Sequence, residues 1–440
     1  MFIFVKYGRA YMTLLERTIF FTILFSVIFS VQFVVYKTFR NYLLRKNLDK
    51  KVVNYLSRTP FLVFLIPYIL FFVTRYDMAI LPDWLNKTVI MPFFIFQGAT
   101  IFIGLYLIVG KIIKLPFVII NYILSKIKFL SNKLESIKKK KKVVQFDASR
   151  RKFITASTTV VSGYAFVGAS VGAIQKDNYV VEETTLKIPG LPAEQRGTKI
   201  VMISDIHSGP FMDTGLMSNY VDVINDMKPD LIFIPGDMTN SKREEAAPFA
   251  KSFRELKAKY GVYATFGNHD YFNDVNYIGD VIKNETGIRI LRNEALLIDV
   301  NGKPFSIMGT EDTPDSGGKS NPVITKYITQ TVQRAANIFK EKNVDSATVP
   351  KILLNHKPYV FDDVNDLDFD LMLSGHTHGG QVVFFKYGDI NISIAATVHK
   401  YISGLYQNEG KSLYVSRGIG TVGLPLRFNC PPEITKITLV

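Results

Sequence analysis

The stretch Lys199-Ile200-Val201-Met202-Ile203-Ser204-Asp205-Ile206-His207 places a short apolar segment directly before an acidic residue and a histidine. Such a segment is typical of a buried strand. Four later runs have the same form, with polar residues after them: 231–234, 262–266, 352–354 and 371–373. Helical patterns at 212–227, 243–259 and 323–342 separate these runs. Alternation of this kind predicts an α/β fold in which sheets are covered by helices.

The polar residues after these runs are of the types that bind metal ions or transfer protons. They are Asp205, His207, Asp237, Asn268, His269, Asp270, His356, His376 and His378. Ligand sites in α/β folds lie beyond the carboxyl ends of strands, so we expect these side chains to converge. Carboxylate, imidazole and amide groups suit divalent ions such as Mn, Fe, Zn or Mg. A single zinc site needs three protein ligands, and the surplus here favours two ions. We expect the sixth histidine, His399, to be an ordinary loop or surface residue.

The motifs Asp205-Ile-His207, Gly236-Asp237, Gly267-Asn268-His269-Asp270, His356 and Gly375-His376-Thr377-His378 resemble those of the calcineurin-like metallophosphoesterase family. The resemblance covers Lys199 to Val440. The stretches 414–420 and 431–434 are similar to the family's membrane-anchored bacterial phosphodiesterase branch. The resemblance implies a layered sandwich of two mixed β-sheets flanked by helices over residues 176–440. It also implies hydrolysis of phosphoester or pyrophosphate bonds by a metal-activated hydroxide.

The resemblance assigns a role to each candidate residue. The first metal ion would be held by Asp205, His207 and His378, and the second by Asn268, His356 and His376, with Asp237 bridging the two. His269 would protonate the leaving oxygen as general acid, and Asp270 would fix the tautomer of His269. One position departs from the family, which often has Asp where Asn240 stands. Arg417 either binds phosphate or braces a loop.

The charge of the chain is divided unevenly. Its 53 basic and 38 acidic residues give a net charge of +15. Residues 1–152 hold 25 Lys/Arg and 6 Asp/Glu, whereas 153–440 hold 28 and 32. The second part is therefore slightly acidic, and nucleic acid is not expected as the primary partner. The single cysteine, Cys430, excludes a disulfide framework and a Cys-rich metal site.

Apolar runs predict membrane spans at 18–36, 59–74 and 88–110, within a transmembrane region of residues 1–130. After a basic linker at 131–152, the run 153–175 predicts a further anchor. Its start, Ser149-Arg150-Arg151-Lys152-Phe153-Ile154, is either a twin-arginine-like export signal or an ordinary cluster of positive charge at a helix end. Buried helices of a soluble core are disfavoured, because such a core rarely strings together several runs with basic loops.

The loop charges predict an orientation in the cell membrane. The connection 37–60 has seven basic residues and 111–152 has thirteen, whereas 75–87 has two basic and two acidic residues. Basic loops remain in the cytoplasm, so the linker is expected inside and residues 176–440 outside.

We therefore expect a multi-pass, membrane-anchored, metal-dependent phosphoric ester hydrolase. Its substrate would be a phosphoester, and the anchor favours lipid-linked substrates of the envelope. One alternative is a catalytically silent scaffold or receptor with the same fold, which is disfavoured because no ligand or proton donor is missing. Another is a transporter, which is disfavoured because the apolar runs contain no charged residue.

Overall fold

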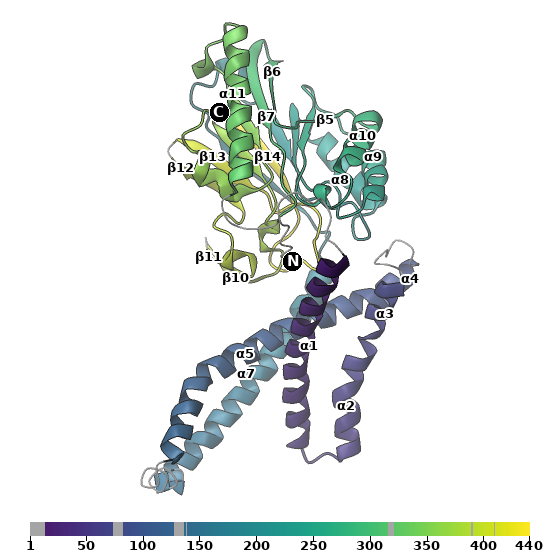
Figure 1. Cartoon of the computed structure of the whole chain (residues 1–440), viewed down its shortest axis with the longest axis vertical. Helices are drawn as coiled ribbons and strands as arrows, with labels where there is room; N and C mark the ends of the chain where they lie inside the picture. The colour runs from purple at the N-terminus through teal and green to yellow at the C-terminus, as the bar shows by residue number, and fades with distance from the viewer. Residues whose placement is uncertain are drawn as a thin grey trace. The chain divides into compact units, whose positions relative to one another are not determined.

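The computed structural model describes residues 14–73, 82–126, 136–137, 139–315, 321–388, 390–408 and 410–440, and Figure 1 shows the chain. The chain divides into a helical unit, Leu15–Val171, and an α/β unit that contains Gly172–Val440. Parts of the predicted transmembrane region (1–13, 74–81 and 127–130) and of the predicted linker (131–135 and 138) lie outside the described residues.

In the part of the chain that the structure describes, the helical unit consists of long apolar helices and shorter helical segments between them. They are α1 (Leu14–Leu44), α2 (Lys50–Val63), α3 (Ile66–Val73), α4 (Asp83–Leu85), the π-helical turn η2 (Asn86–Ile90), α5 (Met91–Lys126) and α7 (Lys141–Ile174). Among the described residues, four segments are long and apolar enough to cross a membrane: Thr22–Leu44, Lys50–Phe71, Asn86–Lys126 and Lys141–Ile174. These helices extend beyond the predicted runs, because a charged residue ends an apolar run without ending a helix. Residues 141–152 of the predicted linker are accordingly the first turns of α7.

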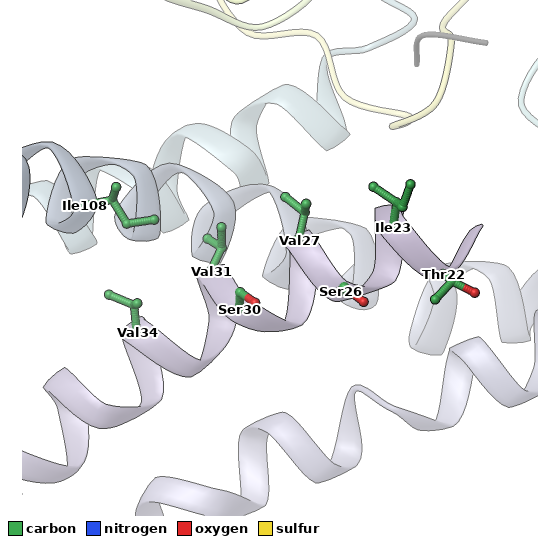
Figure 2. Close-up of a pocket in the computed structure, with 8 residues that line it drawn as sticks. All are labelled: Thr22, Ile23, Ser26, Val27, Ser30, Val31, Val34 and Ile108. Carbon is green, nitrogen blue, oxygen red and sulfur yellow. The ribbon is translucent and has the colours of Figure 1, made fainter. Parts of the chain in front are cut away.

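Side chains of the helical unit pack closely. The Cβ position of Gly104 in α5 would overlap the Val31 side chain in α1, so the glycine permits these helices to approach. A hollow of about 490 Å³ lies along α1. The residues that line it, labelled in Figure 2, are Thr22, Ile23, Ser26, Val27, Ser30, Val31, Val34 and Ile108, and none of these eight is charged.

Two six-stranded sheets form the α/β unit. The first has the order β1-β14-β2-β3-β4-β5 and the second β12-β13-β9-β8-β7-β6. The strands of the first are β1 (Val180–Leu186), β14 (Glu433–Leu439), β2 (Lys199–Met202), β3 (Leu231–Pro235), β4 (Val262–Thr265) and β5 (Ile288–Ile290). Those of the second are β12 (Gly404–Asn408), β13 (Lys411–Val415), β9 (Leu371–Ser374), β8 (Lys351–Leu354), β7 (Lys303–Gly309) and β6 (Glu294–Val300). Both sheets are mixed, because β14 pairs antiparallel with β2 and β6 with β7, whereas β2, β3 and β4 pair in parallel, as do β7, β8 and β9.

The predicted layered sandwich is confirmed by the way that side chains alternate along β2. Ile200 and Met202 belong to a buried cluster that also contains residues of the second sheet, such as Ile307. Val201 instead packs under the helices that cover the first sheet, α8 (Thr214–Asp226), α9 (Ala246–Phe253) and α10 (Val275–Glu285). The second sheet is covered by α11 (Pro322–Glu341), and Figure 1 shows α11 on the other side from these three helices.

Candidate metal centre

The structure brings the predicted ligands together from the ends of five strands. Asp205 and His207 follow β2, Asp237 follows β3, Asn268 follows β4, His356 follows β8, and His376 and His378 follow β9. All except the half-buried His376 are buried. Five strand ends of two sheets therefore supply one cluster, which explains why its members are spread over 174 positions of the sequence.

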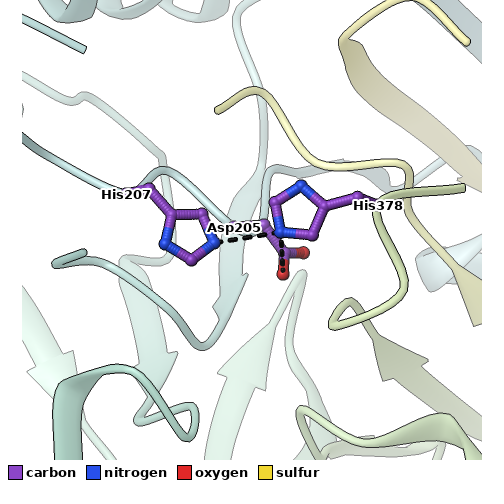
Figure 3. Close-up of side chains that lie close together, drawn as sticks. All are labelled: Asp205, His207 and His378. Atoms are coloured by element: carbon purple, nitrogen blue, oxygen red, sulfur yellow. Dashed lines mark hydrogen bonds and ion pairs between the residues drawn. The ribbon is translucent and has the colours of Figure 1, made fainter. Parts of the chain in front are cut away.

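The first group is Asp205, His207 and His378 (Figure 3). The Nε2 atoms of the two histidines are 3.0 Å apart, and His378 Nε2 is 3.4 Å from Asp205 Oδ1. Burial lowers the pKa of both imidazoles well below the ordinary value, and the neutral form is the one that binds a metal ion. The Nδ1 atoms of both rings are buried without a hydrogen-bond partner. These three residues fit a divalent ion.

Asp237 stands between this group and a second one. Its Oδ2 atom is 3.6 Å from His207 Nε2 and 3.1 Å from His356 Nε2. Its Oδ1 atom accepts a hydrogen bond of 2.8 Å from the backbone N–H of His269. Burial acts to raise the pKa of Asp237, but the imidazoles of His356 and His269 outweigh it and hold the pKa well below the ordinary value. A carboxylate in this position can contact ions on both sides.

The second group is built around His356. Its Nδ1 atom lies 2.8 Å from the backbone carbonyl of Pro235, which orients the ring so that Nε2 faces Asp237. His376 Nδ1 is 2.9 Å from Asn268 Oδ1, and the rings of His356 and His376 are 5.2 Å apart. Burial acts to lower the pKa of His356, but the carboxylates of Asp237 and Asp205 raise it to about 10. The same negative charge that attracts this proton would attract a cation.

The backbone at the cluster is strained. Five of the ligand candidates have positive φ, namely Asp205 (51°), His207 (50°), Asp237 (54°), His376 (74°) and His378 (52°). Left-handed conformations of non-glycine residues cost about 1–3 kcal/mol each and concentrate at functional sites. Such sharp turns direct the side chains of successive loop residues into one small volume.

His269 lies beside the metal-binding groups. Its ring is 4.5 Å from that of His207, and its Nδ1 atom is 2.5 Å from the backbone carbonyl of Asn240. A hydrogen bond from Nδ1 to this carbonyl leaves Nε2 as the nitrogen that can release a proton to another molecule. Burial lowers the pKa of His269.

The carboxylate of Asp270 has partners other than the ring of His269. Asp270 is fully buried and accepts hydrogen bonds from the N–H of Thr239 and Gly267, both at 2.9 Å, and from the Thr239 hydroxyl at 2.9 Å. It contacts Thr239 in the loop after β3, and the Nδ1 atom of His269 faces the backbone of Asn240 in the same loop. Asp270 therefore joins the two loops that carry Asp237 and Asn268. Asn240 serves His269 through its backbone, so the departure from the family's Asp leaves this contact intact.

Two further residues are clarified by the structure. Arg417 forms ion pairs with Glu182 at 2.5 Å and with Glu433 at 2.7 Å, which favours the loop-bracing alternative. His399 is no ordinary surface residue, because its ring is 5.6 Å from that of His376 and is stacked on Tyr359 at 6.4 Å. No motif surrounds His399, so nothing in the sequence could have indicated its place beside a ligand.

The fold is an α/β sandwich with a cluster of Asp and His side chains that could hold a metal ion, and comparisons identify its family. The profile of the calcineurin-like phosphoesterases matches residues 198–380. An uncharacterized metallophosphoesterase of Aquifex aeolicus is 31% identical over 59% of this chain and 91% of its own length. The uncharacterized metallophosphoesterase YkuE of Bacillus subtilis is 30% identical over 66% of this chain and 97% of its own. The chain belongs to the calcineurin-like metallophosphoesterase family.

A further relative is named as a transmembrane protein. A transmembrane protein with metallophosphoesterase domain from Danio rerio is 28% identical over 65% of this chain. The chain spans 62–64% of the length of this and two other curated relatives.

Proposed function

We propose that the chain is a membrane-anchored phosphoesterase that binds two divalent ions and hydrolyses a phosphoester or pyrophosphate bond. The position of Asp237 carries this proposal. Its carboxylate is within 3.6 Å of imidazole nitrogens from both groups, and the pKa shift keeps it charged. A charged carboxylate that lies between two groups of imidazole ligands is suited to bridge two cations.

The residues of the cluster divide the chemistry between them. Two divalent ions would lower the pKa of a bound water and stabilise the entering and leaving oxygens. Asp205, His207 and His378 would hold one ion, and Asn268, His356 and His376 the other. Asp237 keeps the two sets at a fixed separation. His269 donates a proton from Nε2 to the leaving oxygen, while Asn240 holds its ring through Nδ1.

The helical unit supports an anchored enzyme with lipid-linked substrates. Four segments are long and apolar enough to cross a membrane, and the basic loops favour an α/β unit outside the cytoplasm. A scaffold of the same fold without catalytic activity is the second candidate. It is disfavoured because the cluster has a complete set of candidate ligands and a candidate proton donor.

Hydrolysis of bis-p-nitrophenyl phosphate by the full chain in detergent, with Mn²⁺, Fe²⁺, Zn²⁺ or Mg²⁺ added, tests the activity. We expect turnover with at least one ion and a metal content near two per chain. Asp237→Asn should lose both together, because the amide cannot bridge two cations. Absence of turnover with every ion, in a folded sample, would favour the scaffold.

The single, buried cysteine makes the orientation testable. Ala347→Cys places a thiol at an exposed position of the α/β unit, and Lys139→Cys places one in the basic segment. A membrane-impermeant maleimide added to intact cells should label the first variant and spare the second. The reverse pattern would place the α/β unit in the cytoplasm.

A further inference from the structure

A small hairpin follows the loop that carries His376 and His378. Its strands are β10 (Val383–Tyr387) and β11 (Ile390–Ser393), which pair only with each other. Figure 1 shows them at the opposite end of the α/β unit from β6. Phe385 pairs with Ile392 and Lys386 with Asn391. Because side chains alternate along a strand, Phe385, Tyr387 and Ile392 share one face, and Lys386 and Asn391 share the other.

The apolar face of this hairpin is open. Phe385 and Ile392 are each 52% exposed and Tyr387 is 74% exposed. Ile394, just after β11, is 59% exposed. We call these four residues the hairpin face. Exposed apolar side chains that lie close together mark a site of contact with a membrane or with another protein.

The other face of the hairpin is attached to the metal centre. Asn391 donates a hydrogen bond of 3.3 Å from Nδ2 to the backbone carbonyl of Gly379, next to His378. The segment after β11 then leads to His399, whose ring contacts that of His376. The hairpin face therefore belongs to the surroundings of the metal centre and points away from it.

Backbone hydrogen bonds also connect the hairpin to the last turn of α7. The N–H of Arg427 donates to Gly172 at 3.0 Å, and the N–H of Phe428 donates to Gln381 at 3.0 Å. Val383, the first residue of β10, donates to Phe428 at 2.9 Å. These residues all belong to the α/β unit. The first residue of the hairpin is therefore bonded to Phe428, and the adjacent Arg427 is bonded to the last turn of α7, the helix predicted to anchor the chain.

The short connection between α7 and β1 also limits the distance between the α/β unit and the end of α7. Residues 175–179 are all that separates α7 from β1, and five extended residues span at most about 18 Å. The start of β1 therefore lies within about 18 Å of the end of α7. Ile174, the last residue of α7, is itself 78% exposed.

We propose that the hairpin face enters the interfacial layer of the lipid bilayer. The bilayer is the apolar phase that α7 is long and apolar enough to enter, and the hydrogen bonds of Arg427 and Phe428 connect the start of the hairpin to the last turn of α7. Together with the proposed hydrolysis, this contact would hold the metal centre beside lipid headgroups and would make a membrane lipid phosphoester the substrate class. The docking itself does not depend on hydrolysis and can be measured without it.

The single tryptophan of the chain permits a direct test. In a Trp84→Phe background, Phe385→Trp places a reporter on the hairpin face. Tyr277→Trp, at a 43% exposed position of α10, is the matched control. Both full-length variants are reconstituted in phosphatidylcholine vesicles with acyl chains brominated near the headgroup. We expect emission from the Phe385→Trp variant to fall by about twofold or more relative to unbrominated vesicles, since an interfacial side chain lies about 5–10 Å deep. Emission from the Tyr277→Trp control should not change.

Two outcomes would overturn the proposal. Unquenched emission at the wavelength of water-exposed tryptophan would mean that the face stays in solvent. Unquenched but blue-shifted emission would mean that another protein surface, such as a second copy of the chain, covers it.

An activity measurement tests the substrate class separately. The double variant Phe385→Ser with Ile392→Ser should hydrolyse bis-p-nitrophenyl phosphate as the parent does. Its turnover of a phosphatidic acid presented in vesicles should fall about tenfold or more, because two large apolar contacts are lost. An equal loss of turnover on both substrates would refute a role of the hairpin face in binding the lipid substrate. Absence of all turnover in the parent would refute the proposed function, and the fluorescence quenching would still test the membrane contact.

Discussion

Gly375→Ala tests whether the cluster around Asp205 is the working centre. The Cβ atom of an alanine at this position would be 2.2 Å from Asp205 Oδ2 and 1.8 Å from Ser204 Oγ. Ordinary van der Waals contacts of a Cβ atom begin at 3.4 Å, so the Asp205 carboxylate must move away by about 1.2 Å. A displacement of about 1 Å at a catalytic group can lower the rate about 100-fold, which corresponds to about 2.7 kcal/mol of transition-state stabilisation.

The retreat would also disturb the contacts that hold Asp205. Its Oδ1 atom accepts a hydrogen bond of 2.9 Å from the N–H of His376, and Ser204 donates to its Oδ2 atom. We therefore expect kcat/KM for bis-p-nitrophenyl phosphate to fall about 100-fold and the bound metal, measured by mass spectrometry, to fall with it. Overpacking of this kind costs about 1–3 kcal/mol in stability, so the variant should still fold.

Gly287→Ala is the matched control, because nothing lies within 4 Å of its Cβ position. This variant should keep the metal content and activity of the parent. If Gly375→Ala also kept both, with an unchanged circular dichroism melt, Asp205 could not be a ligand in the working centre.

Three further predictions concern the proton donor, the metal ions and Asp270. His269→Ala should lower kcat about 10²–10⁴-fold while the metal content is kept. The loss should be larger for a methyl ester than for a p-nitrophenyl ester, because the poorer leaving group needs the proton more. Equal losses on the two esters would contradict the role of His269 as an acid. Removal of metal by EDTA should lower Tm by about 5–10 °C, since ions at about 100 times Kd contribute about 2.7 kcal/mol, and an unchanged Tm in a calorimetric scan would mean that the cluster binds none. Burial and the charge of Asp237 raise the pKa of Asp270 to about 7, against an ordinary value of about 3.9. The contribution of Asp270 to stability is then complete below about pH 4 and is lost as pH rises through about 7. In EDTA, the Tm of Asp270→Asn relative to the parent should therefore rise between pH 5 and pH 8, and a constant difference would refute the shift.

Local patterns in the sequence were sufficient for most of the fold and for the identities of the candidate ligands. Apolar runs such as 199–204 and 371–373 became β2 and β9, because a short β-branched segment between turns has little alternative to a buried strand. Asp205, Asp237 and the two histidines of the 375–378 motif were evident because each directly follows such a run. The predicted helix at 243–259 was too long, since its first residues form a 3₁₀ turn and α9 ends at Phe253.

The hydrogen-bond partners of site residues and the exposure of side chains depended on contacts between segments that lie far apart in the chain. The family resemblance implied that Asp270 fixes the tautomer of His269, yet Asp270 accepts hydrogen bonds from Thr239 and the ring of His269 faces the Asn240 backbone. The place of His399 beside His376 required the hairpin to fold back across the ligand loop. The face that Phe385 and Ile392 share is exposed in the tertiary structure. The sequence by itself determined the fold class and the candidate ligands, because strand propensity and ligand chemistry are local properties. The tertiary structure decided hydrogen-bond partners and open surfaces, because these depend on which distant segments the sheets bring together.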